Sequence, residues 1–88
     1  APNSLINPRD LLADVVELAS PRAHQEQIEL QSDVQEGTPL IAGDHGEVVQ
    51  ILLNLVSNSL DALQGVEGPV VRITAKARSE SLVELAVE

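Results

Sequence analysis

Six polar side chains share one face of the segment 45–63, which we expect to be a helix. At about 100° per residue they fall within one arc of roughly 100°; they are Glu47, Gln50, Asn54, Ser57, Asn58 and Asp61. Asn and Ser compete for the backbone in mid-helix, so their presence costs roughly 1–2 kcal/mol relative to Ala. Amides both donate and accept hydrogen bonds, and their oxygens suit Mg²⁺. This polar stripe fits either a cleft wall that binds a polar ligand or a solvated helix face.

Two helices are expected to position the stripe and support it. Asp44 followed by Glu47 fits a capping box at the start of 45–63, and the rest of that segment is nearly all apolar, which predicts a largely buried helix. Another helix begins at Asn7-Pro8, where Asn caps and Pro occupies the first turn. Pro21 predicts that this helix ends or kinks near Ser20, with a short continuation through Ala23 as the alternative.

Alternating apolar residues predict four strands, at 28–34, 40–42, 71–77 and 82–87. The last two read as an antiparallel hairpin turning near 79–81. Three of the five basic residues form one outer row of this hairpin, opposite acidic residues of the next strand: Arg72, Lys76 and Arg78. A solvated sheet face with cross-strand ion pairs is the favoured interpretation of this row, and a phosphate-binding patch is the alternative.

Composition limits the chain to one domain without aromatic or sulfur chemistry. It has 88 residues, a net charge of −9 and no Cys, Met, Phe, Tyr or Trp, so the core must consist of Leu, Val, Ile and Ala. Disulfides and thiolate sites are excluded, and the strong acidity argues against nucleic acid as a partner. The order α-β-β-α-β-β predicts an α+β two-layer sandwich, with helices on one face of a mainly antiparallel sheet.

The run from Asp44 to Leu63, DHGEVVQILLNLVSNSLDAL, resembles the N-box helix of the ATP-binding domain of two-component sensor histidine kinases. Upstream, Pro21-Arg22-Ala23, Ile28-Glu29-Leu30 and Gly43-Asp44 are similar to spacers of that domain, so the resemblance covers nearly the whole chain. It implies the Bergerat ATP-binding fold, here in part, with ATP and Mg²⁺ as ligands.

The resemblance also implies site residues. Asn58 would be the Mg²⁺ ligand that bridges the ion to the nucleotide phosphates. Asn54 would line the phosphate pocket one turn earlier, and Asp61 would face the nucleotide one turn later. Many such kinases carry Lys or Arg at position 61, so Asp there is closer to the chaperone and gyrase pattern. Hydrolysing relatives carry a Glu general base where this chain has Asn54, and an amide cannot accept a proton at neutral pH. This favours phosphoryl transfer over hydrolysis.

Residues 1–88 are therefore expected to be an incomplete histidine-kinase ATP-binding domain that ends before the family's Asp-x-Gly-x-Gly motif. The 88 residues alone should be inactive and prone to self-association through exposed sheet edges. The parent would be a cytoplasmic kinase or the cytoplasmic part of a membrane-anchored sensor. Its partners would be the phospho-acceptor histidine domain, of the same or a partner kinase chain, and a downstream response regulator. His24 and His45 are not expected to be catalytic.

Two alternatives remain open at this point. One is an ATP-hydrolysing, chaperone- or topoisomerase-like domain of the same superfamily. The other is an acidic protein-docking module without nucleotide chemistry.

Overall fold

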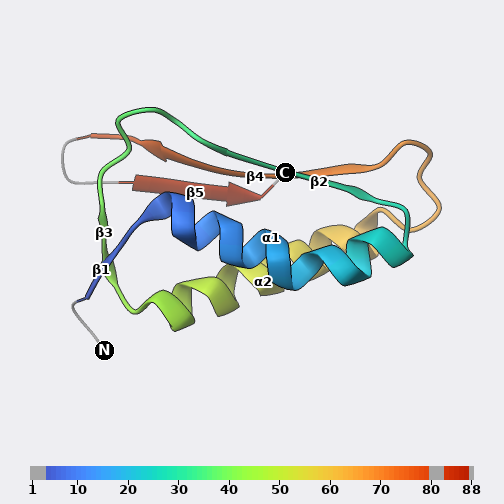
Figure 1. Ribbon diagram of the computed structural model, residues 1–88. Helices are drawn as coiled ribbons and strands as arrows, with labels where there is room; N and C mark the ends of the chain where they lie inside the picture. The colour runs from blue at the N-terminus through green and yellow to red at the C-terminus, as the bar shows by residue number, and fades with distance from the viewer. Residues whose placement is uncertain (1–3, 80–82, 88) are drawn as a thin grey trace.

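The computed structural model describes residues 4–79 and 83–87. Along this part of the chain the elements are β1 (Ser4–Ile6), α1 (Pro8–Gln25), β2 (Glu29–Val34), β3 (Ile41–Gly43), α2 (His45–Ala62), β4 (Val70–Ala77) and β5 (Val83–Val87). Helices α1 and α2 lie side by side against one face of the sheet that β2, β4 and β5 form (Figure 1). The predicted α+β two-layer sandwich is confirmed.

The strands form a mixed sheet and a separate small ribbon. In the sheet, β4 lies in the centre, parallel to β2 with Glu29 opposite Val70, and antiparallel to β5 with Ala77 opposite Val83. The ribbon pairs β1 with β3 in antiparallel register, with Ile6 opposite Ile41. The hairpin predicted from the alternation is therefore confirmed. Residues 80 and 81 of its expected turn, and residue 82 at the start of its expected second strand, lie outside the described residues.

Cross-strand ion pairs occupy the hairpin's outer row. Glu84 lies opposite Lys76 in the register, with 3.5 Å between Lys76 Nζ and Glu84 Oε2, and Arg78 Nε lies 3.3 Å from Glu84 Oε1. Arg72 instead donates to Gln31 Oε1 on β2, at 3.2 Å from Nε and 3.0 Å from Nη2. All three cations thus have partners across the sheet, as the favoured interpretation of the row predicts.

Helix α1 corrects the expectation that Pro21 ends or kinks it near Ser20, since it runs on to Gln25. The proline removes one backbone donor, the one that would bond to the Glu17 carbonyl. Pro21 and Glu17 are both exposed, so water can reach that carbonyl. Buried apolar contacts continue past the proline to Ala23, which is only 2% exposed, and this packing offsets the lost hydrogen bond.

Strand β1 is an element that the sequence analysis did not predict, so the observed order begins with a strand. Three residues are too few to show a period of two. Ile6 is nevertheless 1% exposed, and its pairing with Ile41 ties the start of the chain to the segment just before α2.

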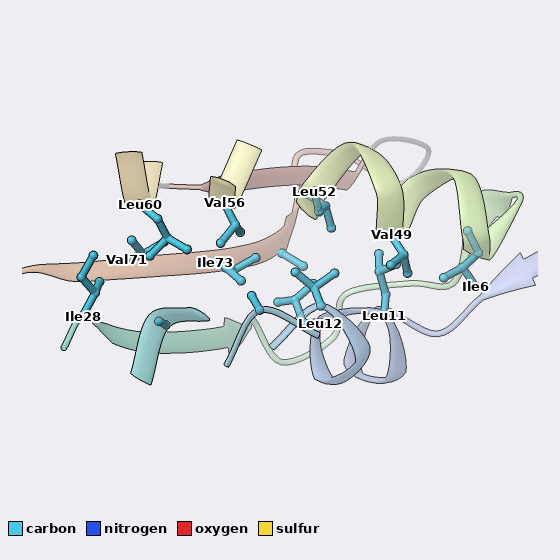
Figure 2. Packing of buried hydrophobic residues seen from close by; sticks show 14 residues of the cluster. Ile6, Leu11, Leu12, Ile28, Val49, Leu52, Val56, Leu60, Val71 and Ile73 are labelled. Carbon is cyan, nitrogen blue, oxygen red and sulfur yellow. The ribbon is translucent and has the colours of Figure 1, made fainter. Parts of the chain in front are cut away.

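The core fills the space between the two helices and the sheet (Figure 2). Every member is Leu, Ile, Val or Ala, as the composition predicts. Helix α1 contributes Leu11, Leu12, Val15, Ala19 and Ala23; α2 contributes Val49, Leu52, Val56 and Leu60; β4 contributes Val71, Ile73 and Ala75; and Ile6 and Ile28 close the ends. The buried positions of β4 alternate strictly, because only one face of this strand meets the helices.

Helix α2 is less buried than its composition predicts. Ile51 is 58% exposed and Leu55 is 43% exposed, both outside the arc of the helix that packs into the core. The helix packs against α1 and the sheet along only one arc, so the apolar residues outside that arc remain in solvent. Within residues 4–79 and 83–87, neither helix combines the length and hydropathy that crossing a bilayer requires.

Candidate functional site

Helix α2, which carries the polar stripe, begins at a side-chain N-cap. Asp44 is the N-cap residue, with extended backbone, and its Oδ1 accepts a hydrogen bond from the Glu47 backbone N–H at 3.0 Å. This bond favours the ionised carboxylate and lowers the pKa of Asp44 below its usual range. The helix runs unbroken from His45 to Ala62, so the spacing of residues 54, 58 and 61 places them on one face.

That face is open to solvent. Asn54, Asn58 and Asp61 are all exposed, on the side of α2 away from the core. Gln50 Nε2 donates to Asn54 Oδ1 at 3.2 Å, which leaves the Asn54 amino group free to donate outward. Within the described part of the chain, the Asn58 amide has no hydrogen-bond partner. An asparagine in the middle of a helix lowers the stability of the helix, and binding of a ligand to its exposed amide would explain why it is there.

Arg22 of α1 reaches across to the stripe. Its Nη1 donates to Ser57 Oγ at 2.9 Å, its Nη2 forms an ion pair with Asp61 Oδ1, and its Nε donates to Glu26 Oε2 at 2.6 Å. The hydrogen bonds to Glu26 and Asp61 raise the pKa of Arg22. Asp61 is thus paired with a cation of the neighbouring helix.

This pairing was missed by the sequence analysis, although a signal existed. Three of the five basic residues lie in the hairpin row, which leaves Arg9 and Arg22 on α1. Arg22 lies in the C-terminal part of α1, level with the C-terminal half of α2. The signal was the acidic residue at position 61, where the resemblance implies a cation in many relatives, because a carboxylate there favours a basic partner nearby.

A second feature, distinct from the stripe, lies where the N-terminal half of α2 passes α1. His45 Nε2 lies 2.6 Å from Asp14 Oδ2. Beside this pair is a hollow of about 350 Å³, lined by Asp14, Glu17, Leu18, His45, Gly46 and Val49. His45 therefore joins the two helices at the surface, while His24 is exposed near the end of α1.

Comparison with solved structures identifies the architecture. The catalytic domain of the histidine kinase ThkA superposes with a TM-score of 0.84 at 21% identity, over 99% of this chain and 57% of that one. Full-length ShkA, solved in complex with AMPPNP, gives a TM-score of 0.84 at 35% identity, over 97% of this chain and 18% of that one. No protein-family model matches the chain.

Curated sequences agree with these structures. The sensor histidine kinase GacS of Pseudomonas protegens is 41% identical over 83 residues, which are 92% of this chain and 9% of that protein. The sensor protein GacS of Pseudomonas syringae pv. syringae is 44% identical over 70 residues, or 78% of this chain and 8% of that protein. In both sequence and fold, the chain matches part of the catalytic domain of sensor histidine kinases. It spans less than a tenth of the length of the GacS relatives.

The side-chain oxygens on α2 fit a hard cation that takes only one or two ligands from the protein. Among the described residues, no three His, Asp or Glu side chains converge to hold a metal. Mg²⁺ usually takes one or two protein oxygens and completes its shell with water and substrate phosphates. The unengaged, exposed amide of Asn58 offers one such oxygen, so the residues present fit an ion that arrives with a nucleotide.

Proposed function

We propose that this chain supplies one wall of the Mg-ATP site of a sensor histidine kinase, which donates the γ-phosphate of ATP to a histidine. The observation that carries the proposal is the exposed amide of Asn58 in the middle of α2, one turn after Asn54 and without a partner among the described residues. The sequence similarity to GacS, and the likeness to ShkA in its AMPPNP complex, support it.

Each residue of the stripe has a separate role in this proposal. Asn58 would hold Mg²⁺ through its amide oxygen. The Asn54 amino group donates to a phosphate oxygen, since its own oxygen already accepts from Gln50. Asp61 marks the edge of the site nearest α1. The ion held there would supply positive charge beside the transferring phosphate.

Transfer to a histidine is favoured over hydrolysis by the residue at position 54. Hydrolysis needs a group that takes a proton from water, and a neutral amide cannot do so. Transfer to an imidazole nitrogen needs mainly positioning and charge stabilisation. We therefore assign the acceptor to the histidine domain of the same or a partner kinase chain, on the cytoplasmic side where ATP is available.

The phosphate would then pass to a response regulator. The structural neighbours include a complex of ThkA with the response regulator protein TrrA, to which this chain aligns with a TM-score of 0.81. With a net charge of −9, the chain is an unsuitable surface for nucleic acid.

Label transfer in the parent kinase tests the proposal against both alternatives. The whole kinase is incubated with Mg-ATP labelled at the γ-phosphate, and protein-bound label is compared with free phosphate. We expect protein-bound label that acid releases and alkali does not, the behaviour of a phosphoramidate. Release of free phosphate with no labelled protein would favour the chaperone- or topoisomerase-like alternative. Failure to bind nucleotide at all would favour a docking module.

A further inference from the structure

The polar stripe of α2 carries acidic groups where an anionic ligand is proposed to bind. Asp61 lies three residues after Asn58, so the two side chains are neighbours on the helix surface. A polyphosphate approaching Asn58 therefore meets a carboxylate about one turn away. In the described part of the chain, Arg22 is the basic residue whose side chain contacts this stripe.

Contacts on three sides fix the orientation of the Arg22 guanidinium. Its Nε is tied to Glu26 on its own helix at 2.6 Å, and its two terminal nitrogens reach Ser57 and Asp61 on α2. The Glu26 carboxylate is itself held, since Gln64 Nε2 donates to its other oxygen. The Arg22 side chain is 37% exposed, so water screens this charge only in part.

We propose that Arg22 is a positioning residue for the nucleotide site, an inference that rests on the proposed function. It neutralises Asp61 and holds that carboxylate toward α1, so that the anionic phosphates can approach Asn58. Without Arg22, Asp61 becomes an unpaired negative charge beside the phosphates.

Four forms of the whole kinase test this role: wild type, Arg22→Gln, Asp61→Asn and the double variant. The measurement is the dissociation constant of Mg-AMPPNP by calorimetric titration, accompanied by thermal unfolding without nucleotide. We expect Arg22→Gln to weaken binding by about three- to tenfold, and the loss to shrink at high salt because the effect is electrostatic. Asp61→Asn removes the like charge and should tighten binding.

The double variant separates charge compensation from a merely structural clamp. Carrying neither charge, it should return to within about twofold of wild type. Arg22→Lys is the matched control, because it keeps the positive charge but loses the several N–H donors of the guanidinium. Its affinity for Mg-AMPPNP should lie between those of wild type and Arg22→Gln. A clamp without an electrostatic role would lower thermal stability in all variants, with no recovery of affinity in the double variant.

Three results would overturn the inference: unchanged affinity in Arg22→Gln, a loss that Asp61→Asn does not restore, or a loss of binding in Asp61→Asn alone. The last would make Asp61 itself a ligand. None of these requires the proposed function to fail, because wild-type binding of Mg-AMPPNP is measured in the same series. Absence of wild-type binding would contradict the proposed function and this inference together.

Discussion

Gln27 holds the backbone in a conformation that side chains disfavour. Gln27 follows the end of α1 and has a φ of 58°. Its N–H donates to the His24 carbonyl at 3.1 Å, and the Ile28 N–H donates to the Ala23 carbonyl at 2.9 Å. Glycine is the usual residue at such a helix end, because a Cβ in the left-handed region costs about 1–2 kcal/mol.

We therefore expect Gln27→Gly to raise the free energy of unfolding by about 0.5–1 kcal/mol, after the greater freedom of glycine in the unfolded chain is subtracted. Gln25→Gly is the matched control, because Gln25 is an exposed residue of the last turn of α1 with ordinary helical geometry, and it should destabilise. Urea unfolding of the kinase domain measures both. A lower free energy of unfolding in Gln27→Gly than in wild type would show that the left-handed backbone of Gln27 is not strained.

Individual site residues differed in how far the sequence could predict them. Asn54 and Asn58 can be recognised from the sequence, because amides are unfavourable in mid-helix and their spacing puts them on one face. In the structure both are exposed on α2. The link from Asp61 to Arg22 spans 39 residues along the chain. No local pattern encodes such a contact; it depends on how α1 and α2 are placed side by side.

The start of helix α2 depends on an ionised cap. The depressed pKa of Asp44 means that its contribution to stability is complete above the unfolded-state pKa, near 3.8, and is lost as the pH falls through the lower folded-state value. Asp44→Ala should therefore lower the melting temperature at pH 7, and the difference from wild type should shrink below about pH 4.

Asp44→Asn provides the control for this helix start. Asn caps helices about as well as Asp but does not titrate. This variant should stay close to wild type at pH 7 and should not lose its cap in acid. Equal acid sensitivity of the Asp44→Ala and wild-type proteins would contradict the assignment of the shift to the cap.

Neighbouring residues of α2 offer a direct test of which arc packs. Leu52 is 2% exposed in the core, whereas Ile51 is 58% exposed. Leu52→Ala should cost about 2–5 kcal/mol of unfolding free energy, and Ile51→Ala should change it by no more than about 0.5 kcal/mol. Chemical denaturation measures both. Similar losses in the two variants would mean that α2 is rotated from the orientation described.

Elements with strong periodicity were predictable, and those defined by long-range pairing were not. The cap and apolar pattern of α2 and the alternation of β4 give nearly their observed bounds. Strand β1 is too short to show a period, and its partner β3 lies far along the chain, beyond α1 and β2. The end of α1 was predicted too early because the packing of Ala23 outweighs the local effect of Pro21.

In the whole molecule, the proposed site is one exposed helix face. Helices α1 and α2 share one side of the sheet (Figure 1). Asn54, Asn58 and Asp61 of the stripe are exposed to solvent. A nucleotide site normally buries most of its ligand, so a single helix face needs groups from other segments of the kinase to enclose ATP. The chain spans 57% of the ThkA catalytic domain, and nucleotide binding is therefore best measured on the whole kinase.

Replacement of Asn58 by Asp in the whole kinase tests the central claim most directly. The carboxylate keeps the shape and an oxygen for Mg²⁺ but brings negative charge toward the phosphates. Because Asn58 is exposed and has no hydrogen-bond partner within the described residues, folding should change by no more than about 0.5 kcal/mol. The measurement is the rate at which label from γ-labelled Mg-ATP appears on the protein. We predict a strong loss of labelling at nearly unchanged thermal stability; labelling of Asn58→Asp at the wild-type rate would contradict the account.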